Sequence, residues 1–410
     1  MAPPELVLVL NVGSSSVKAA LVAAGAEAGH QGGLKGELTG GDPSSRPWTG
    51  QRELRGEPLV QVLEQWLLPQ LQPWWPHIRL AGHRVVHGGE ALTRPTAIDA
   101  AVVAQLRALV PLAPLHNGPA LEAILWLQAA RPPLPQWACF DTGFHASLAP
   151  EAYTYAIPEA WRRRGLRRFG FHGLNHQHVA ETVARRQASG QAPDQRPAGE
   201  LRLISCHLGA GCSLAAIRGG RSLDTTMGFT PLEGLVMASR SGSVDPGLLL
   251  QLLREGLPLA ELDQQLTRES GLRGLSGLSG DWRELRDAAG SGHGGAQLAL
   301  AVFRHSLLKG IGAMAASLGG VDVIALSGGI GANDALLAEE LRAALVWLSP
   351  FTLLTVPADE EGMVARLCLT ASSQPRTLQP QSPPAQGFSP GGRAGRASGA
   401  AAGSGAGDRR

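Results

Sequence analysis

The stretch from Leu6 to Val22, LVLVLNVGSSSVKAALV, starts with five apolar residues, passes through a turn of small polar residues and returns to an apolar run. Short apolar runs on both sides of a glycine turn are typical of two buried strands joined in a hairpin. Residues 201–217, LRLISCHLGAGCSLAAI, repeat this pattern at a constant offset of 196 residues, which pairs Asn11 with His207. The repeat favours a duplicated domain over a chance similarity between two glycine-containing strands.

A third apolar run, VDVIALSGGIGAND from Val321 to Asp334, also leads into a glycine turn. Amphipathic stretches lie between the runs, and we expect helices in them, at residues 99–110, 118–130, 246–266 and 296–318. Strands that alternate with helices predict an α/β architecture. In a duplicated domain each half would supply one phosphate-facing hairpin, and a nucleotide would lie in the cleft between the halves.

Charge along the chain is nearly balanced, with 36 Lys and Arg against 34 Asp and Glu in 410 residues. Residues 371–410 hold five arginines and one aspartate, so the small positive excess belongs to this end. The remainder argues against nucleic acid as a partner, because binding a phosphate backbone needs a clustered basic surface. Residues 371–410 are also rich in Pro, Gly, Ser and Ala, which predicts a disordered tail or, as the alternative, a weakly basic interaction arm.

The four cysteines show no two-residue spacing of the kind found in zinc sites and redox pairs, and they are too few for a disulfide framework. The first residues, MAPPELVLVLN, lack the basic start and the apolar run of a signal peptide. No stretch approaches the roughly 18 apolar residues that a membrane span requires. We therefore expect a soluble cytoplasmic protein without a membrane partner.

The turn after the first apolar run carries Asn11, Gly13, three serines and Lys18. Glycine and serine let backbone N–H groups approach phosphate oxygens, and a lysine adds a point cation. The spacing matches neither the P-loop nor the dinucleotide-binding fingerprint, so an ordinary serine-rich hairpin explains it equally well. Two further glycine turns, His207–Gly211 and Ser327–Gly331, follow apolar runs in the same way. Three such turns in one chain favour a nucleotide cleft.

Five short motifs combine a charged or imidazole side chain with glycine. They are GHRVVHGGE around Arg84, APLHNG around His116, FDTGFH around Asp141, FGFHG around His172 and ASRSGSVDPG around Arg240. A single arginine or histidine is usually a surface or structural residue. Glycine near each of these residues instead indicates loops where the backbone comes close to a ligand.

The order of these motifs, with ESGL, SGGIGAN and the long block from Asp224 to Gly247, resembles the acetate kinase family from about Leu6 to Arg366. The resemblance implies the duplicated, ribonuclease H-like ATPase fold of actin, hexokinase and the heat-shock chaperones. It places an actin-like domain at residues 1–146, a second one at 147–370 with its last helix crossing back, and the tail at 371–410. The nucleotide cleft would lie between the two domains.

The resemblance also implies the reaction: reversible, Mg²⁺-dependent transfer of a phosphoryl group from ATP to acetate, giving acetyl phosphate and ADP by direct in-line transfer in a homodimer. Elementary chemistry agrees with it. A carboxylate acceptor with a pKa of roughly 4 to 5 is already ionised at pH 7, so no general base is needed. The obstacle is repulsion between two anions, and the site should be rich in arginine, histidine and metal.

Five motif residues match the catalytic positions of the family. Arg84 and Arg240 would hold the acceptor carboxylate and the migrating phosphoryl group. His172 would stabilise the equatorial oxygens of that group, and His116 would line its site. Asp141 matches an essential aspartate assigned to acid–base work or metal organisation, and we favour metal organisation because the acceptor is already ionised.

The remaining matches concern the metal, the nucleotide and the acyl group. Asn11 and Glu360 match the Mg²⁺-linked positions. The positions matched to ATP are Lys18, His207, Leu208, Gly209, Ala210, Gly211, Asp281, Trp282, Arg283, Gly328, Gly329, Ile330, Gly331 and Ala332. Four residues match the apolar pocket for the acetate methyl group, although ordinary core packing explains each of them as well, and these are Val86, Leu115, Phe171 and Pro231.

The chain also departs from the family pattern. Ala210 stands where asparagine is usual, and a lost hydrogen bond to a charged group is worth roughly 1.5 to 3 kcal/mol. Further departures occur at Cys212, Ser243, Ala332 and Asp359. They bear on efficiency and nucleotide preference more than on reaction type. A propionate or other short-chain acyl kinase is one alternative, because one methylene discriminates by only about 1 to 3 kcal/mol. A weakened or non-catalytic nucleotide-binding homologue is another.

Overall fold

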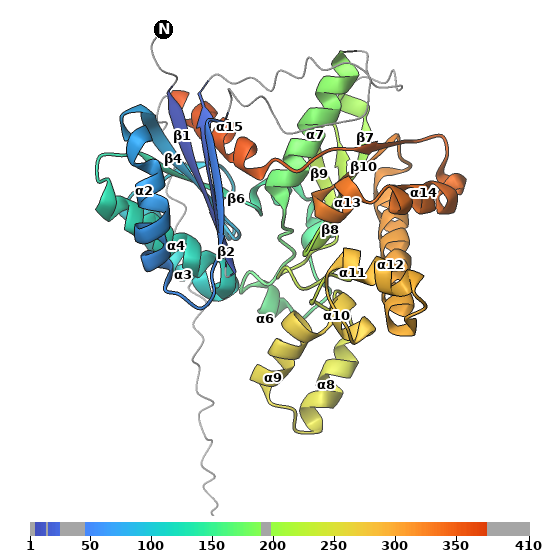
Figure 1. Ribbon diagram of the computed structural model, residues 1–410. Helices are drawn as coiled ribbons and strands as arrows, with labels where there is room; N and C mark the ends of the chain where they lie inside the picture. The colour runs from blue at the N-terminus through green and yellow to red at the C-terminus, as the bar shows by residue number, and fades with distance from the viewer. Residues whose placement is uncertain (1–4, 14, 25–45, 190–197, 375–410) are drawn as a thin grey trace, which may run out of the picture. The chain divides into compact units, whose positions relative to one another are not determined.

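The computed structural model of the chain describes residues 5–13, 15–24, 46–189 and 198–374. Within this part the chain forms two β-sheets, each flanked by helices (Figure 1). Residues 375–410, which make up most of the predicted tail, lie outside the described residues. The first residues of that predicted tail instead complete the last helix, which ends at Ser373.

The first sheet has six strands in the order β3-β2-β1-β4-β6-β5. Their bounds are β1 Leu6–Val12, β2 Ser16–Ala23, β3 Trp48–Glu53, β4 Ile78–Val85, β5 Thr96–Ala97 and β6 Gln136–Phe140. β1, β2 and β3 form an antiparallel meander, while β4 and β6 add in parallel beside β1. β1 is buried on both faces, because alternate residues of a strand point to opposite sides and both sides of this sheet are covered.

The second sheet has five strands in the order β11-β10-β7-β8-β9. Their bounds are β7 Arg202–Leu208, β8 Cys212–Arg218, β9 Arg221–Thr225, β10 Val323–Ser327 and β11 Thr352–Thr355. β7, β8 and β9 are antiparallel, and β10 and β11 follow in parallel beside β7. This repeats the plan of the first sheet except for β5, which pairs antiparallel with β6 and has no counterpart here. The duplicated α/β fold expected from the two apolar hairpins is confirmed.

The α-helices of the described part connect and cover these sheets. They are α1 Leu59–Val62, α2 Leu68–Leu71, α3 Ala100–Leu109, α4 Pro114–Ala130, α5 Pro150–Tyr153, α6 Glu159–Arg162, α7 Gly173–Ala188, α8 Pro246–Arg254, α9 Leu259–Gln264, α10 Gly271–Ser276, α11 Trp282–Gly290, α12 Gly294–Leu318, α13 Gly328–Asn333, α14 Ala335–Ala344 and α15 Glu360–Ser373. Short 3₁₀ and π segments extend or join several of them.

Two of the expected elements differ from the structure. The stretch 246–266 is not one helix: Gly256, at φ 94°, and Pro258 separate α8 from α9. A left-handed glycine ends a helix readily, and proline fits at the start of the next one. The residues after Ser327 are not a plain turn either, because they form the short helix α13 directly after β10.

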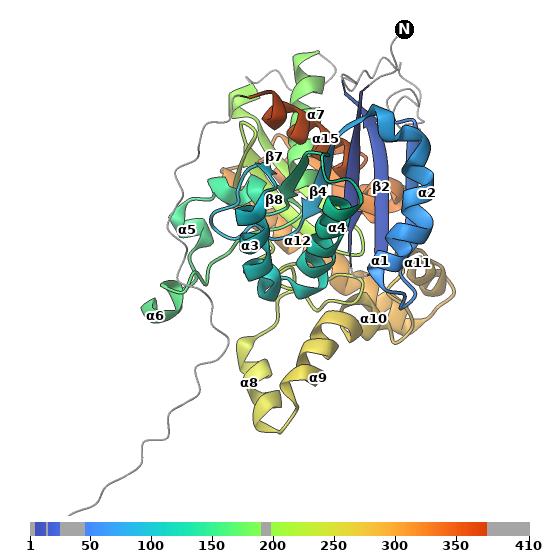
Figure 2. The same cartoon turned by 90° about the vertical axis from the view of Figure 1, so that its left-hand side faces the viewer.

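The last helix returns to the first sheet. α1, α2 and α4 cover one face of that sheet, and α15 packs on the other (Figures 1 and 2). The contact depends on Gly82 in β4, because a Cβ there would lie 2.7 Å from Cγ1 of Val364 and 2.8 Å from Sγ of Cys368. Glycine thus lets a helix from the end of the described chain approach a strand near its beginning.

One helix, α12, is long and apolar enough to cross a membrane by length and composition, which the sequence had not led us to expect. In the structure its apolar face lies in the core of the second half, where Phe303, Leu307 and Ile311 are fully buried. Its N-terminal end is capped by His293 and its C-terminal end by Gly319 in the left-handed conformation. This is the environment of a core helix.

Candidate active site

Arg84 lies near the end of β4 and forms a buried ion pair with Asp141. Asp141 directly follows β6, the parallel neighbour of β4, so the two residues meet at the same edge of the sheet. Arg84 Nη2 donates to Asp141 Oδ2 at 2.6 Å, and Arg84 Nε donates to Asp141 Oδ1 at 3.0 Å. The Asp141 side chain is only 1% exposed. A desolvated, two-point arginine–carboxylate contact of this kind is both strong and directional.

Two further oxygens reach the same guanidinium. Arg84 Nη1 donates to Glu360 Oε2 at 2.7 Å and to Asn11 Oδ1 at 3.3 Å. Glu360 is the first residue of α15 and Asn11 lies near the end of β1, so the return of α15 brings both oxygens to β4. Asn11 Nδ2 also donates to Glu360 and to Glu361, each at 3.3 Å. An amide oxygen and a carboxylate oxygen therefore converge on one cationic nitrogen.

Arg84 and Glu360 stabilise one another's charge, whereas burial and the nearby Glu360 raise the pKa of Asp141 in spite of Arg84. Burial by itself would lower the pKa of Arg84, but Asp141 and Glu360 outweigh it and raise that pKa. Burial would raise the pKa of Glu360, yet Arg84, His207 and Lys18 together hold it below its ordinary value. Arg84 and Glu360 are therefore both charged at neutral pH. Of the five guanidinium hydrogens of Arg84, these bonds leave one, on Nη2, for a ligand.

His172 begins α7 in the left-handed conformation, with φ at 56°, and no other non-glycine residue of the described chain has a positive φ. Such a backbone costs about 1 to 3 kcal/mol and persists only where its surroundings hold it. Gly173 N donates to Asp141 O at 2.9 Å, and a Cβ at Gly173 would lie 2.1 Å from that oxygen. On the other side, His145 Nε2 lies 3.0 Å from Phe171 O and donates to it. The turn that carries His172 is thus fixed on both sides.

The imidazole of His172 faces the hairpin of the second sheet. Its Nδ1 lies 2.9 Å from Ser213 Oγ, and its ring lies 4.2 Å from the ring of His207. Its Nε2 points toward Gly211, where an added Cβ would lie 3.1 Å from that nitrogen and 3.6 Å from Arg240 Nη1. Burial lowers the pKa of His172 well below its ordinary value, and His207, Arg84 and Arg240 lower it further. The ring is therefore neutral and stands beside two arginines from different halves.

Arg240 differs from Arg84 in having no carboxylate partner among the described residues. It follows β9 in a long loop, where its Nη1 donates to the Pro231 carbonyl at 3.0 Å and lies 3.7 Å from Met237 Sδ. Burial lowers its pKa. A partly buried cation without a counter-ion is unfavourable, so this position favours binding of an anion.

His116 lies in the first turn of α4 and is half-buried. Burial lowers its pKa to about 4, and the charges of Arg240 and Arg84 act in the same direction. Their influence on one ring indicates that His116 lies near both arginines. Arg84, His172, Arg240 and His116 are therefore gathered in one region, together with Asp141.

The four residues expected around the acyl group are in different surroundings. Phe171 is 1% exposed and belongs to the core of the second half, where its ring lies 5.6 Å from that of His87. Val86 and Pro231 are half-buried, and Val86 packs against the same core. Leu115, the residue before His116, is 42% exposed. The structure therefore places Phe171 in the core and leaves Leu115 accessible.

The glycine turns expected at the phosphates lie side by side. β7 and β10 are parallel neighbours that pair His207 with Ser327, so their turns meet at one edge of the sheet. A Cβ at Gly209 would lie 3.7 Å from the backbone nitrogen of Gly329. Gly328 adopts φ 79°, and a Cβ there would lie 2.5 Å from Leu208 O. Leu208 is buried, Ala210 is exposed and Gly331 packs near Leu326 and Leu208.

The residues expected near the base and ribose have mainly local partners. Asp281 caps α11 by accepting from Arg283 N, and its carboxylate pairs with the exposed Arg283 side chain at 2.8 Å. Trp282 is 7% exposed; its Nε1 donates to Asp334 Oδ2 at 2.5 Å and its ring lies 4.7 Å from that of Phe303. Trp282 is thus a core residue, and Arg283 is the accessible member of this group.

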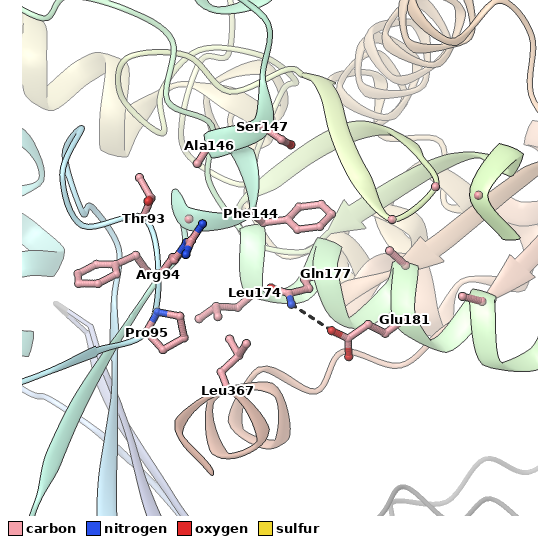
Figure 3. Close-up of a pocket in the computed structure, with 17 residues that line it drawn as sticks. Thr93, Arg94, Pro95, Phe144, Ala146, Ser147, Leu174, Gln177, Glu181 and Leu367 are labelled. Atoms are coloured by element: carbon pink, nitrogen blue, oxygen red, sulfur yellow. Dashed lines mark hydrogen bonds between the residues drawn. The ribbon is translucent and has the colours of Figure 1, made fainter. Parts of the chain in front are cut away.

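A separate cavity of about 790 Å³ lies elsewhere, between the loop at Thr93–Pro95, α7 and Leu367 of α15 (Figure 3). Phe144, Leu174 and Leu367 form apolar parts of its wall, and Gln177 donates to Glu181 at its edge. None of the site residues predicted from the sequence lines it, although Phe140, Gly143 and Phe144 of the FDTGFH motif do. The predicted site residues and this cavity are therefore different regions of the molecule.

Comparison with known proteins identifies the family. The model of the acetokinase family matches residues 6–365. The chain belongs to this family. It is 46% identical to the acetate kinase of a Synechococcus strain over 351 residues, which cover 80% of this chain and 84% of that protein. It is 45% identical to the acetate kinase of Deinococcus deserti over 344 residues, with coverage of 81% and 83%.

Solved structures of the acetokinase family agree with the fold. The acetate kinase of Porphyromonas gingivalis superimposes with a TM-score of 0.75 at 32% identity, covering 89% of this chain and 99% of that one. A propionate kinase of Francisella tularensis gives a TM-score of 0.76 at 30% identity, covering 88% and 98%. Members of the acetokinase family are phosphotransferases with a carboxyl group as acceptor, which confirms the family and the enzyme class expected from the motifs.

The motifs did not single out several buried residues of this region. His176 lies one helical turn after His172, and Ser205 and Ser213 lie on β7 and β8; all three are fully buried. His145 holds the turn before His172 and itself accepts from Ser222 Oγ at 2.8 Å. The spacing of His172 and His176 was a usable signal, because residues four apart share a helix face. The two serines gave none, since serine is common in strand sequences of every kind.

Proposed function

We propose that this chain transfers the γ-phosphoryl group of ATP to acetate, giving acetyl phosphate and ADP, and also catalyses the reverse reaction. The proposal rests on one observation: an arginine without a carboxylate partner, a neutral imidazole and an arginine paired with carboxylates lie in one region. Arg240 is a partly buried arginine without a carboxylate partner in the described chain, and it stands beside the neutral ring of His172 and close to the compensated Arg84. Cations and neutral donors together are what two mutually repelling anions require.

The acceptor carboxylate needs no activation, because it is ionised at neutral pH. Its approach to the γ-phosphoryl group requires neutralisation, and in our proposal Arg240 supplies it together with the remaining N–H of Arg84. His172 donates from Nε2 to an equatorial phosphoryl oxygen, and His116 lines the same site as a neutral ring. Val86, Pro231 and the accessible Leu115 surround the acyl group. Direct in-line transfer then needs positioning and charge compensation only.

For the nucleotide, we propose that the two adjacent glycine turns receive the phosphates. Backbone N–H groups at Gly209–Gly211 and Gly328–Gly331 approach oxygens closely because no side chain intervenes. Lys18, exposed on β2 opposite Asn11, supplies a point cation. Arg283 reaches the base or ribose from outside the core. The halves at residues 1–146 and 147–370 close over ATP and exclude water, so that transfer to carboxylate is favoured over hydrolysis.

The oxygen atoms of Asn11 and Glu360 are of the kind that Mg²⁺ prefers, which supports a Mg²⁺ site at these residues. Hard cations take carboxylate and amide oxygens, and Mg²⁺ typically keeps several waters and uses one or two protein ligands plus substrate phosphates. Asn11 Oδ1 and Glu360 Oε2 already converge on one positively charged nitrogen, Arg84 Nη1. No cluster of three or more His, Cys, Asp or Glu in the described ranges forms a closed metal cage. We propose that Asn11 and Glu360 hold Mg²⁺ with ATP, that Asp141 organises them through Arg84, and that the ion supplies charge compensation at the phosphates.

The test is direct detection of the product. Purified protein with Mg-ATP and acetate, propionate or butyrate is incubated with hydroxylamine, which traps acyl phosphates as hydroxamates. We expect acetyl hydroxamate, with less product as the chain of the acid lengthens. Absence of hydroxamate from every acid would end the kinase proposal and leave a non-catalytic nucleotide-binding homologue. More product from propionate than from acetate would instead establish a propionate kinase, the activity named for the Francisella relative.

We also propose a homodimer that works in the cytoplasm. α8 has no buried residue, and with α9 it carries four exposed leucines, Leu248, Leu250, Leu253 and Leu259, which are 39 to 73% exposed. Several exposed apolar side chains on two consecutive helices favour an interface. All four cysteines are buried free thiols, as suits a reducing compartment. Light scattering should give twice the chain mass, and Leu250→Glu should shift it to a monomer; a monomeric wild-type protein would contradict the dimer.

A further inference from the structure

A chain of buried hydrogen bonds runs from the second sheet to the ring of His172. Ser205 Oγ lies 2.9 Å from His176 Nδ1, His176 Nε2 lies 2.8 Å from Ser213 Oγ, and Ser213 Oγ lies 2.9 Å from His172 Nδ1. Ser205, His176 and Ser213 are each 0% exposed. Solvent therefore does not take part in these bonds, and each hydrogen in the chain must find its acceptor within the protein.

The direction of the bonds is restricted by the number of hydrogens. Burial lowers the pKa of His176, as it does that of His172, so both rings are neutral at pH 7. A neutral imidazole has one donor nitrogen and one acceptor nitrogen, and a hydroxyl has one hydrogen. Ser213 therefore donates to one of the two rings and accepts from the other, which gives two arrangements of the whole chain. A third, in which Ser213 accepts from both rings, leaves the Ser213 hydrogen without an acceptor among the described contacts and is disfavoured.

In the first arrangement Ser205 donates to His176, His176 donates from Nε2 to Ser213, and Ser213 donates to Nδ1 of His172. Every hydroxyl hydrogen then has an acceptor, and His172 carries its own hydrogen on Nε2. In the second arrangement all directions reverse, and the Ser205 hydroxyl hydrogen loses its acceptor. The described residues offer Ser205 Oγ no second partner. A buried unsatisfied donor costs about 1 to 3 kcal/mol, so the first arrangement is favoured.

We propose that Ser205, His176 and Ser213 are positioning residues that lock His172 as the Nε2–H tautomer and aim that hydrogen at the anion between Arg84 and Arg240. The identity of the anion as a transferring phosphoryl group rests on the function proposed above. The tautomer itself rests on the hydrogen-bond chain and on the neutrality of the two buried rings.

The lock gives His172 a definite role. With Nδ1 occupied as an acceptor, the ring offers one donor in one direction and does not act as a base toward the acceptor carboxylate. The left-handed backbone of His172 fixes the direction of its side chain, and the hydrogen bond to Ser213 fixes the rotation of its ring. A donor held in place before the reaction stabilises developing charge without reorganising. A misoriented tautomer would present a lone pair to the phosphoryl oxygens and repel them.

The kinetic test uses Ser213→Ala, which removes the hydroxyl between the two rings. We expect kcat to fall about 10- to 100-fold, as is typical when an orienting hydrogen bond is lost, with little change in KM for ATP or acetate. Ser213→Thr, which keeps Oγ, should recover most of kcat. Ser147→Ala is the matched control, because it also removes a serine hydroxyl bonded within the protein, to Ser222 O at 2.8 Å. It should retain wild-type kcat.

A second measurement reads the tautomer without any reaction. In ligand-free protein labelled with ¹⁵N-histidine, and with the His172 signals assigned by their loss in His172→Gln, we expect an unprotonated Nδ1 and a protonated Nε2. Ser213→Ala, or His176→Gln if the former does not fold, should give a mixture of tautomers. A protonated Nδ1 in the wild type, or an unchanged spectrum in the variant, would overturn the lock. A wild-type protein that forms no acyl hydroxamate yet shows the expected tautomer would refute the proposed function and leave the lock standing.

Discussion

The two halves of the molecule share one strand plan but end their strands in different chemistry. In the first half, β1, β4 and β6 lead into Asn11, Arg84 and Asp141, whose side chains contact one another. In the second half, β7 leads into the glycine turn at Gly209, and β10 leads into the glycine-rich start of α13 at Gly328. The two sheets therefore share one strand plan, but the strand ends carry charged residues in the first half and glycines in the second.

The electrostatic difference follows the same division. Arg84 in the first half is compensated by two buried carboxylates and stays fixed between them. In the second half, His172 and His207 are neutral through burial, and Arg240 has no carboxylate partner in the described chain. An incoming anion thus meets a preassembled network on one side and an uncompensated cation on the other.

The largest effect is expected from Arg84→Ala, which dismantles the network of the first half. Turnover in the hydroxamate assay should fall by about 10³ to 10⁵, the range found when a phosphoryl-stabilising arginine is removed. The variant should also be less stable by about 3 to 5 kcal/mol, because Asp141 is left as a buried charge without its partner. Rates are therefore compared on protein shown to be folded by circular dichroism. Arg376→Ala, in the tail, is the control, and an equal loss in both would refute the assignment.

A smaller effect is expected at the metal position. Glu360→Gln should raise the Mg²⁺ concentration for half-maximal rate by about 10- to 100-fold, because it removes a carboxylate that reaches both Asn11 and Arg84. Glu361→Gln is a matched control on the same helical turn, since Glu361 accepts from Asn11 and, within the described part of the chain, not from Arg84. A Mg²⁺ titration of the rate measures both. Equal shifts in the two variants would remove Glu360 from its proposed role.

Gly82→Ala tests how α15 is attached to the first half. The added Cβ would meet Val364 and Cys368 at less than 3 Å, so overpacking should cost about 1 to 3 kcal/mol. Gly312→Ala in α12 is the opposite case, because nothing lies within 4 Å of its Cβ position and alanine favours a helix by about 1 kcal/mol. The urea concentration at the midpoint of unfolding should therefore fall for Gly82→Ala and rise for Gly312→Ala. A Gly82→Ala protein as stable as the wild type would mean that α15 packs more loosely on β4 than described.

The smallest effect is a pH dependence of stability. Burial lowers the pKa of His83, His87 and His145 to about 4, whereas histidine in an unfolded chain has a pKa of about 6.5. Between these values the unfolded chain binds protons that the folded one does not, so the free energy of unfolding rises with pH. Stability should be complete above about pH 6.5 and decline toward pH 4. Urea unfolding across this range should show a shallower slope for His83→Gln, and an unchanged slope would contradict the burial of that ring.

The sequence singled out Arg84 and Asp141 as glycine-flanked residues and placed both in loops, whereas Arg84 lies within β4 and Asp141 directly follows β6. Arg84 and Asp141 stand at the ends of neighbouring parallel strands, and a strand end fixes where the next side chain lies. The offset between the hairpins likewise predicted the repeated sheet, because it aligned Asn11 with His207. Local patterns of this kind depend on a few adjacent residues, and the sequence displays them.

Features that depend on contacts between distant segments could not be predicted. The hydrogen bond between Ser213 and His172 joins residues 41 positions apart, and it forms only because β8 lies beside the start of α7. The sequence did not indicate that Trp282 is buried, because its hydrogen-bond partner, Asp334, lies at the start of a different helix. The break between α8 and α9 was visible in Gly256 and Pro258, but the apolar periodicity on both sides concealed it. Tertiary packing decided each of these.

We propose that Arg84 from the first half and Arg240 from the second act on the same anion. A double-mutant cycle of Arg84→Lys and Arg240→Lys, measured as kcat/KM for acetate, shows whether the two arginines are coupled. We predict that the double variant loses less than the sum of the single losses by more than about 1 kcal/mol, because residues that serve one ligand are coupled. Losses that add to within about 0.5 kcal/mol, the behaviour of independent sites, would contradict it.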